Sequence, residues 1–491
     1  MIFHVHLDRV RTAGTAAEHQ ALREELTYDL GPKRRGAGRL RMALYDPLAA
    51  EFPIGLLREA EAALRARGVP VATTDLRARP AARRGLPLAW LDPHQREATE
   101  AAIRAGVGTI KVPTAGGKGE VIAALCWELP IPWLVLCEDK SVLHQLGADL
   151  HPSDPRRHGR IRLRTGELPA RVGDSLWEPG RRVVVAMCQT LHQHWDGDRW
   201  SPQAQALLST RRGVIFDEAH GSASARGQLI LRALGRCYWR VGLSATPAGR
   251  SDGRDAAIRA QLGPVVYSIG EAELEAGGKI AGGSVRMVRL EQPDAPPYEA
   301  GGYQKCVALS RARAQVCAAI WQREGPGNLT FVWSTDHGRY LLSVAQALGI
   351  PAAFLHGEHD TEERREAIAR WERGEVHVLI CSDVLRQGAD LIHCYSGINA
   401  AGMRASIPVI QRRGRGKRVC RTENCPRCAV MGKKTDLTWY DFDDVDPAAE
   451  DARRTRRKTL PGDWLRRHTA ARRRAYEDLG IRVEMITAAQ I

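Results

Sequence analysis

The sequence lacks an apolar run long enough to cross a membrane. Its most apolar stretch, 121–137, is interrupted by Glu128, Pro130 and Pro132 and is shorter than the roughly 20 residues that a bilayer span needs. The first ten residues, MIFHVHLDRV, carry charges where a secretory signal peptide needs an apolar segment. The 11 cysteines are scattered over 491 residues, too thinly for the disulfide framework of a small secreted domain. We therefore expect a cytoplasmic protein with no membrane partner.

Acidic residues are also scarce. The chain has 57 Asp and Glu against 72 Lys and Arg, which gives a formal net charge of +15. This excess suits a polyanionic partner such as nucleic acid, although charge bears on association and not on fold or reaction. With 44% hydrophobic and 26% charged residues the composition is that of a globular protein, and the length suggests roughly two to four domains.

Short β-rich apolar runs alternate with helical patterns in two long segments, 87–290 and 303–447, and this alternation predicts two parallel-sheet α/β domains. A Pro- and Gly-rich stretch, 291–302, is predicted to link them. Residues 1–86 mix short alternating runs with a helical pattern at 54–66 and are predicted to form a small α+β domain. Residues 448–491 are predicted to be a basic tail. The predicted strands are 108–112, 133–137, 182–187, 214–216, 238–243, 329–334, 352–355, 376–382 and 397–400.

Two motifs in the first α/β segment carry chemistry. In GTIKVPTAGGKGE, 108–120, an apolar strand leads through a small-residue loop into a helix, so that backbone N–H groups and Lys118 can bind phosphates. In VIFDEAH, 214–220, Asp217 can hold Mg²⁺ and Glu218 can polarise an attacking water. A simple Gly-rich turn and a solvated acidic strand end are the alternatives. Both motifs together, in this order, favour a nucleotide-hydrolysing site.

Further motifs follow along the chain, and together with these two they make residues 91–446 resemble the superfamily 2 nucleic-acid helicases and translocases, whose motifs have the same order. LDPHQREA precedes the phosphate loop, PTAGGKG resembles motif I and FDEAH motif II, and GLSATP resembles motif III. FVWSTDHG lies where motif IV belongs, CSDVLRQGADL resembles motif V and QRRGRGKR resembles motif VI. The resemblance implies two tandem RecA-like domains that use ATP and Mg²⁺.

The resemblance also assigns roles to residues. Arg415 and Arg418 would be arginine fingers that reach across an interdomain cleft to the γ-phosphate, Gln411 would contact the nucleotide, and Gln95 would read adenine. Lys118, Asp217 and Glu218 complete the predicted catalytic set. The predicted nucleotide-binding residues are Gln95, Pro113, Thr114, Ala115, Gly116, Gly117, Lys118, Gly119, Glu120, Gly388 and Asp390. The predicted contacts to the nucleic-acid backbone are Thr190, Ser244, Thr246, Ser334 and Ser382.

The N-terminal segment indicates which branch of the superfamily 2 helicases this chain resembles. LTYDLG, 26–31, the basic run after it, and 52–71 loosely resemble an accessory domain of phage recombination helicases and of a eukaryotic repair and transcription helicase. There the domain contacts DNA, and a plain α/β cap is the alternative. In the basic tail, Trp464 and Tyr476 lie among arginines, which permits base stacking but is equally compatible with a solvated helix.

Motif I departs from the family pattern at one position. The family has Thr or Ser after the lysine, where the hydroxyl ligates Mg²⁺, and this chain has Gly119. A water or Glu120 could replace the missing oxygen, or the ATPase could be degenerate. Because Lys118, Glu218 and both predicted fingers are retained together, an active enzyme is the favoured interpretation.

Three cysteines follow motif VI directly. Cys420, Cys425 and Cys428 have the spacing of a zinc knuckle, but a structural zinc site normally has four ligands. His393 or Cys394 could supply the fourth, and a hairpin with reduced thiols is the alternative.

The sequence therefore predicts an ATP-dependent DNA helicase or translocase acting on single-stranded, forked or branched DNA. By resemblance the polarity would be 3′ to 5′. The alternatives are an ATPase-deficient DNA-binding protein, a motor subunit of a larger complex, and an RNA helicase, because the shared motifs grip the backbone and do not select the sugar.

Overall fold

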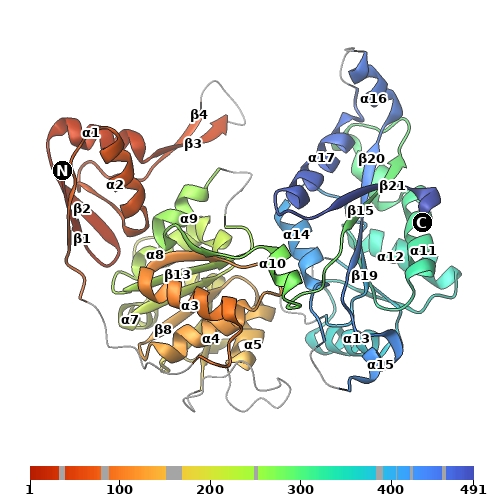
Figure 1. Ribbon diagram of the computed structural model, residues 1–491, viewed down its shortest axis with the longest axis horizontal. Coiled ribbons are helices and arrows are strands. Elements are labelled where there is room, and N and C mark those ends of the chain that lie inside the picture. Colours follow the sequence, from red (N-terminus) through yellow and green to blue (C-terminus); the bar gives the residue numbers. More distant parts are fainter. Residues whose placement is uncertain are drawn as a thin grey trace. The chain divides into compact units, whose positions relative to one another are not determined.

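The structure is a computed structural model that describes residues 1–32, 39–78, 88–150, 168–247, 253–382, 391–404, 406–420, 424–455 and 460–491 (Figure 1). The chain forms two compact units. One contains Met1–Pro113 and Gly117–Ile269, and the other contains Thr114–Gly116 and Gly270–Ile491. None of the helices in the described part of the chain is long and apolar enough to cross a membrane.

A four-stranded sheet forms the N-terminal part of the first unit, with the strand order β5-β2-β1-β6. Helices α1 (Ala16–Glu25) and α2 (Leu57–Ala66) bury Leu22 and Leu64 against its Phe3 and Val10. The helix predicted at 54–66 is confirmed as α2 preceded by a 3₁₀ turn. The strands are β1 (Ile2–Val5), β2 (Arg9–Ala13), β5 (Glu51–Pro53) and β6 (Ala72–Asp75), and a separate hairpin pairs β3 (Thr27–Pro32) with β4 (Arg39–Ala43).

This N-terminal part packs on the larger sheet domain of the same unit through α9 (Asp255–Leu262). Ala260 of α9 belongs to the N-terminal hydrophobic core, and Arg259 Nε donates to Glu59 Oε2 at 3.1 Å. A Cβ on Gly55 would lie 1.9 Å from the Arg259 carbonyl oxygen, so only glycine permits this close approach.

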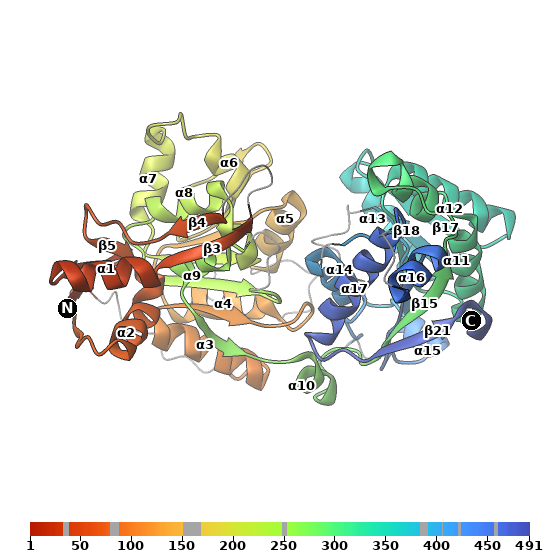
Figure 2. The same ribbon diagram turned by 90° about the horizontal axis from the view of Figure 1, so that it is seen from above.

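The sheet domain of the first unit has eight strands in the order β10-β9-β11-β8-β12-β13-β7-β14. All neighbours run parallel except β9 and β10. Helices cover the sheet on both faces (Figures 1 and 2), as parallel sheets require. The strands are β7 (Val107–Lys111), β8 (Trp133–Cys137), β9 (Ala170–Gly173), β10 (Leu176–Trp177), β11 (Val183–Met187), β12 (Gly213–Asp217), β13 (Trp239–Ser244) and β14 (Val265–Ser268). The helices are α3 (Pro93–Ala105), α4 (Lys118–Glu128), α5 (Lys140–Asp149), α6 (Cys188–His192), α7 (Pro202–Thr210) and α8 (Ala225–Ala233).

The second unit is built on a seven-stranded, all-parallel sheet in the order β17-β18-β16-β19-β20-β15-β21. Its fully buried strands read as continuous apolar runs, for example Val378–Cys381. The strands are β15 (Val285–Glu291), β16 (Asn328–Phe331), β17 (Ala352–Leu355), β18 (Val378–Cys381), β19 (Ser396–Asn399), β20 (Thr438–Val445) and β21 (Val483–Thr487). The helices are α10 (Glu271–Ala276), α11 (Arg311–Glu324), α12 (Thr335–Ala347), α13 (Thr361–Arg373), α14 (Ser406–Arg415), α15 (Pro426–Met431), α16 (Pro447–Arg454) and α17 (Asp463–Glu477).

The predicted fold class is confirmed: two parallel-sheet α/β domains follow a small α+β domain. The boundaries differ at two places. The first α/β domain was predicted to end at 290, but its last predicted residues form β15, which pairs with β20 and β21 in the second sheet. The expected basic tail is also part of that domain, because β21 is its edge strand and α17 packs on β20. Trp464 and Tyr476 are at most 3% exposed, so they belong to the core and are not available for base stacking.

Candidate nucleotide site and nucleic-acid interface

The carboxyl edge of the first sheet brings the two predicted nucleotide motifs together. β13 lies between β7 and β12, and the register pairs Leu243 with both Ile110 and Asp217. Because the three strands are parallel, their carboxyl ends meet at one edge of the sheet. The phosphate-loop segment after β7 and the acidic pair after β12 therefore flank the end of β13.

The predicted phosphate loop ends at Gly117, which precedes the first residue of α4. Gly117 has a φ of +87°, a left-handed conformation that favours glycine. A Cβ there would lie 2.1 Å from Gln95 Nε2 and 3.0 Å from Glu120 Oε2. The side chains predicted to read adenine and to supply a spare carboxylate thus both lie against this glycine.

Lys118 and Glu218 form the central ion pair of this edge. Lys118 Nζ donates to Glu218 Oε1, and each side chain is only 13% exposed. Burial alone would raise the pKa of Glu218, but the neighbouring Lys118 ammonium and His220 lower that pKa well below its ordinary value. Glu218 is therefore an ionised carboxylate that is held by a lysine. Glu218 has a backbone φ of +56°, in the left-handed region, so the chain changes direction directly after β12.

The donor set at this edge fits a nucleotide-bound Mg²⁺ with one protein oxygen fewer than the family pattern. Asp217 ends β12, whereas Gly119 offers no side-chain oxygen. The Glu120 carboxylate lies beside Gly117, in the first turn of α4, and is the nearest replacement in the sequence. Glu218 Oε2 is buried and accepts no hydrogen bond within the described residues; it lies 3.5 Å from His220 Nδ1. A carboxylate oxygen in that state suits the positioning of a water.

Motif VI forms α14 and the turn after it, in the second unit. Three of its basic side chains are committed to buried structural contacts. Arg412 donates to Asn399 Oδ1 at 2.9 Å, while Arg413 and Lys417 each donate to Glu271 Oε2 at 2.6 Å. Gln411 and Arg415 are 7% and 9% exposed.

The five predicted nucleic-acid contacts fall into different surroundings. Ser244 is fully buried and its hydroxyl accepts a hydrogen bond from Thr246 N at 3.1 Å, so it shapes the turn after β13 and cannot reach a phosphate in this conformation. Ser334 is the N-cap of α12, where its hydroxyl accepts from His337 N at 3.2 Å. Ser382 follows β18, and Thr190 and Thr246 are half-buried.

Thr190 lines a pocket of about 500 Å³ at the carboxyl ends of β8 and β11. Asp174 lies on its wall and pairs with Lys140 at 2.5 Å and with His144 at 2.6 Å. The rings of Trp177 and His194 lie against each other on its wall, with their centroids 4.3 Å apart and their planes tilted by 37°. Asp174, Trp177 and His194 were not predicted from the sequence, because they come from segments that only the folded sheet brings to Thr190.

Other residues were missed or fall outside the described residues. His220 belongs to the acidic motif, but its contact with Glu218 emerges only from the structure. Gly388 and Asp390, predicted to contact the nucleotide, lie outside the described residues.

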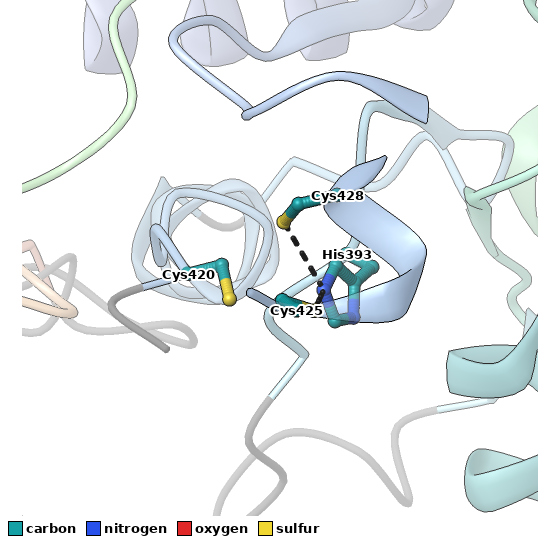
Figure 3. Close-up of side chains that lie close together, drawn as sticks. All are labelled: His393, Cys420, Cys425 and Cys428. Carbon is teal, nitrogen blue, oxygen red and sulfur yellow. Dashed lines mark hydrogen bonds between the residues drawn. The ribbon is translucent and has the colours of Figure 1, made fainter. Parts of the chain in front are cut away.

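The three cysteines after motif VI converge on one histidine of the same unit. His393 Nε2 lies 3.3 Å from Cys425 Sγ and 3.7 Å from Cys428 Sγ, and with Cys420 Sγ all four ligand atoms lie within 4.8 Å of one another (Figure 3). Cys394, the alternative fourth ligand, is excluded from the cluster: its thiol is buried and donates to Ser396 O at 3.2 Å.

Two family models match the chain. Residues 89–249 match the model described as "Type III restriction enzyme, res subunit", and residues 311–420 match the "Helicase conserved C-terminal domain". The DNA 3'-5' helicase XPB of Kineococcus radiotolerans is 25% identical over 321 residues, which cover 64% of this chain and 54% of that protein. The chain thus spans about half the length of this curated relative.

Two solved structures align with most of this chain, and the one with a TM-score above 0.5 shows a likeness of fold. Saccharomyces cerevisiae Dbp5 bound to RNA and ADP BeF3 is 16% identical, covers 81% of this chain and 90% of its own, and has a TM-score of 0.52. The crystal structure of T4 UvsW covers 99% of both chains at 18% identity, with a TM-score of 0.43.

Proposed function

Because the chain belongs to the superfamily 2 helicases, we propose that it is an ATP-dependent DNA helicase or translocase. Its proposed reaction is the hydrolysis of ATP coupled to movement along DNA, with strand separation or branch migration as the result. The observation that carries this proposal is the Lys118–Glu218 pair at the carboxyl edge of the first sheet.

The pair suggests how nucleotide binding starts the cycle. An incoming terminal phosphate is a stronger partner for the Lys118 ammonium than a single carboxylate, because it offers several charged oxygens. Lys118 would then turn from Glu218 to the phosphate. Glu218, relieved of the lysine that lowers its pKa, becomes a better acceptor for the proton of an attacking water.

Around this exchange the remaining residues bind and orient. The N-terminus of α4 and the loop before it present N–H groups to phosphate. Mg²⁺ bound with the nucleotide would neutralise phosphate charge, with Asp217 and Glu120 as its carboxylate partners. By family resemblance alone, we place Arg415 and Arg418 at the γ-phosphate.

DNA is the proposed partner for three reasons. The relative from Kineococcus radiotolerans is named as a DNA 3'-5' helicase, and we propose that polarity here. The net charge of +15 suits a polyanion. The pocket beside Thr190 offers a lysine, a threonine hydroxyl and the adjoining rings of Trp177 and His194, which suits backbone and base contacts.

The test is Mg²⁺-dependent ATP hydrolysis without nucleic acid and with single-stranded DNA, forked DNA or RNA. We expect the largest stimulation with DNA, and its loss in Lys118→Ala. Lys305→Ala, an exposed lysine of the second unit, is the control and should hydrolyse ATP normally. Strand displacement from duplexes with a 3′ or a 5′ overhang then measures polarity.

A second candidate, an ATPase-deficient DNA-binding protein, is favoured by one observation, the glycine at position 119. DNA binding without turnover on any nucleic acid would support it and contradict the motor. A stronger stimulation of ATP hydrolysis by RNA than by DNA would indicate that RNA is the substrate. Weak activity that a co-purifying protein restores would indicate a motor subunit.

A further inference from the structure

We propose that His393, Cys420, Cys425 and Cys428 bind one structural Zn²⁺ ion, which holds the segment after motif VI on the second sheet domain. The four residues belong to a single unit, and the proposal does not depend on ATP hydrolysis or DNA binding.

The distances between ligand atoms fit one tetrahedral ion. Zn–S bonds of about 2.3 Å and Zn–N bonds of about 2.0–2.1 Å place sulfur and nitrogen about 3.6 Å apart on a tetrahedron. His393 Nε2 lies 3.3 Å and 3.7 Å from the sulfurs of Cys425 and Cys428. All four ligand atoms lie within 4.8 Å of one another, which leaves room for a single ion and not for a sulfide-bridged iron cluster. Three thiolates and an imidazole are a donor set that zinc prefers.

The histidine is already oriented for a metal. Its Nδ1 is hydrogen-bonded to Glu372 Oε2 of α13, and the other oxygen of Glu372 accepts from Ile392 N at 3.0 Å. A carboxylate on Nδ1 fixes the ring and its tautomer, and leaves Nε2 facing the cysteines (Figure 3). This carboxylate–histidine arrangement is a common outer shell of zinc sites.

The segment that carries two of the ligands has little else to hold it. Helix α15 has six residues, none of them buried, and Val430 is 84% exposed. A helix this short is not stable by itself in water, and it has no apolar face in the core. Cys425 is its N-cap and Cys428 lies in its first turn, so the proposed ion would anchor the helix at its start.

The site also joins three parts of the domain. His393 precedes β19, Cys420 follows α14, and α15 lies further along the chain. Lys434 connects the same parts next to the cluster, since its Nζ donates to Ile392 O at 3.1 Å and to Gly416 O at 2.7 Å. Removing the ion should loosen the chain on both sides of α15 and the turn that carries Arg418.

The proposal is tested by metal analysis of the full-length chain purified without chelator. We expect about one zinc per chain in the unaltered protein, and almost none in Cys425→Ser and Cys428→Ser. Cys394→Ala is the matched control: it removes a buried thiol next to His393 that is not a ligand, and it should retain the ion. Cobalt in place of zinc should show the visible absorption of a tetrahedral cobalt–thiolate site.

A second measurement uses only the unaltered chain, so it decides the matter even if the serine variants fail to fold. Titration of thiols with a mercurial should release zinc in step with thiol modification, and zinc removal should speed tryptic cleavage after Arg427 and Lys433. Zinc-free protein that takes up no cobalt, equal zinc in Cys425→Ser and the unaltered chain, or bound iron with sulfide would each overturn the proposal.

Discussion

Two charged clusters, one in each unit, differ in how fully their hydrogen-bonding groups are used. In the second unit, Asp441 accepts from Arg472 Nε at 3.0 Å, from Asn399 Nδ2 at 3.0 Å and from Tyr476 OH at 2.9 Å. Arg472 also lies 3.6 Å from Asp444, which pairs with Arg313, and these four charged side chains are at most 3% exposed. In the first unit, Glu218 is held through one oxygen by Lys118.

The difference separates charges that hold the fold from charges that can change partners. A buried carboxylate that already accepts from several donors, as Asp441 does, has little bonding capacity left for a ligand, and removing a partner leaves an uncompensated charge. A pair with spare capacity at the open edge of a sheet can exchange one partner for a phosphate. The number of arginines in a segment therefore does not reveal its role: Arg472, from the segment expected to be a basic tail, is structural.

The largest effect is expected from Arg472→Met. It leaves Asp441 and Asp444 buried beside fewer donors, so the free energy of unfolding should fall by about 3–5 kcal/mol. Urea denaturation of the full chain measures it. The control is Arg473→Met, because Arg473 is the next residue on α17 but is 49% exposed and pairs with Glu477 at 3.5 Å. Equal losses in both variants would contradict the distinction.

Glu218→Gln tests the other cluster. We expect ATP hydrolysis to slow by about 10²- to 10⁴-fold, as when a catalytic base is removed, while ATP still binds and the thermal unfolding temperature changes little. Glu97→Gln, on an exposed face of α3, is the isosteric control. A variant that loses stability but not turnover would place Glu218 with the structural charges.

The pH dependence of stability tests whether His337, in the second unit, is a structural residue that is buried without a charge. Burial, with a smaller contribution from Arg313, lowers the pKa of His337 to about 3. Between pH 6.5 and 3 the unfolded chain binds a proton at this ring that the folded chain does not, so acidification destabilises the fold. Between pH 7 and pH 4.5 the free energy of unfolding should fall in both proteins, but by about 2–3 kcal/mol less in His337→Gln than in the unaltered chain. Denaturant unfolding at the two pH values measures the difference. Replacing the exposed His192 should not change the pH response.

The smallest effect concerns metal use at the nucleotide edge. Gly119→Ser restores a hydroxyl where the family has one, and we expect half-maximal ATP hydrolysis at a several-fold lower Mg²⁺ concentration. Gly119→Ala adds the Cβ without the hydroxyl and should leave the Mg²⁺ dependence unchanged. If both variants shift it equally, helix propensity and not metal ligation is responsible.

Much of the fold followed from local pattern. The predicted strands 133–137 and 352–355 coincide with β8 and β17. In β8 all five residues are buried, and a parallel strand buried on both faces reads as an uninterrupted apolar run. Strands β15 and β21 were not predicted, because charged residues interrupt their short apolar runs and their pairing with β20 and with each other joins distant parts of the chain.

The sequence by itself determined the α/β class and the order of the motifs, and it predicts the roles of Lys118, Asp217 and Glu218, because spacing and residue type are local properties. Tertiary structure alone decided which charges are structural, that Ser244 is buried, and that His393 and not Cys394 joins the cysteines. These outcomes depend on burial and on which distant segments meet, and one-dimensional spacing encodes neither. His393 and Cys394 are neighbours in sequence, but only one of them faces the cysteines.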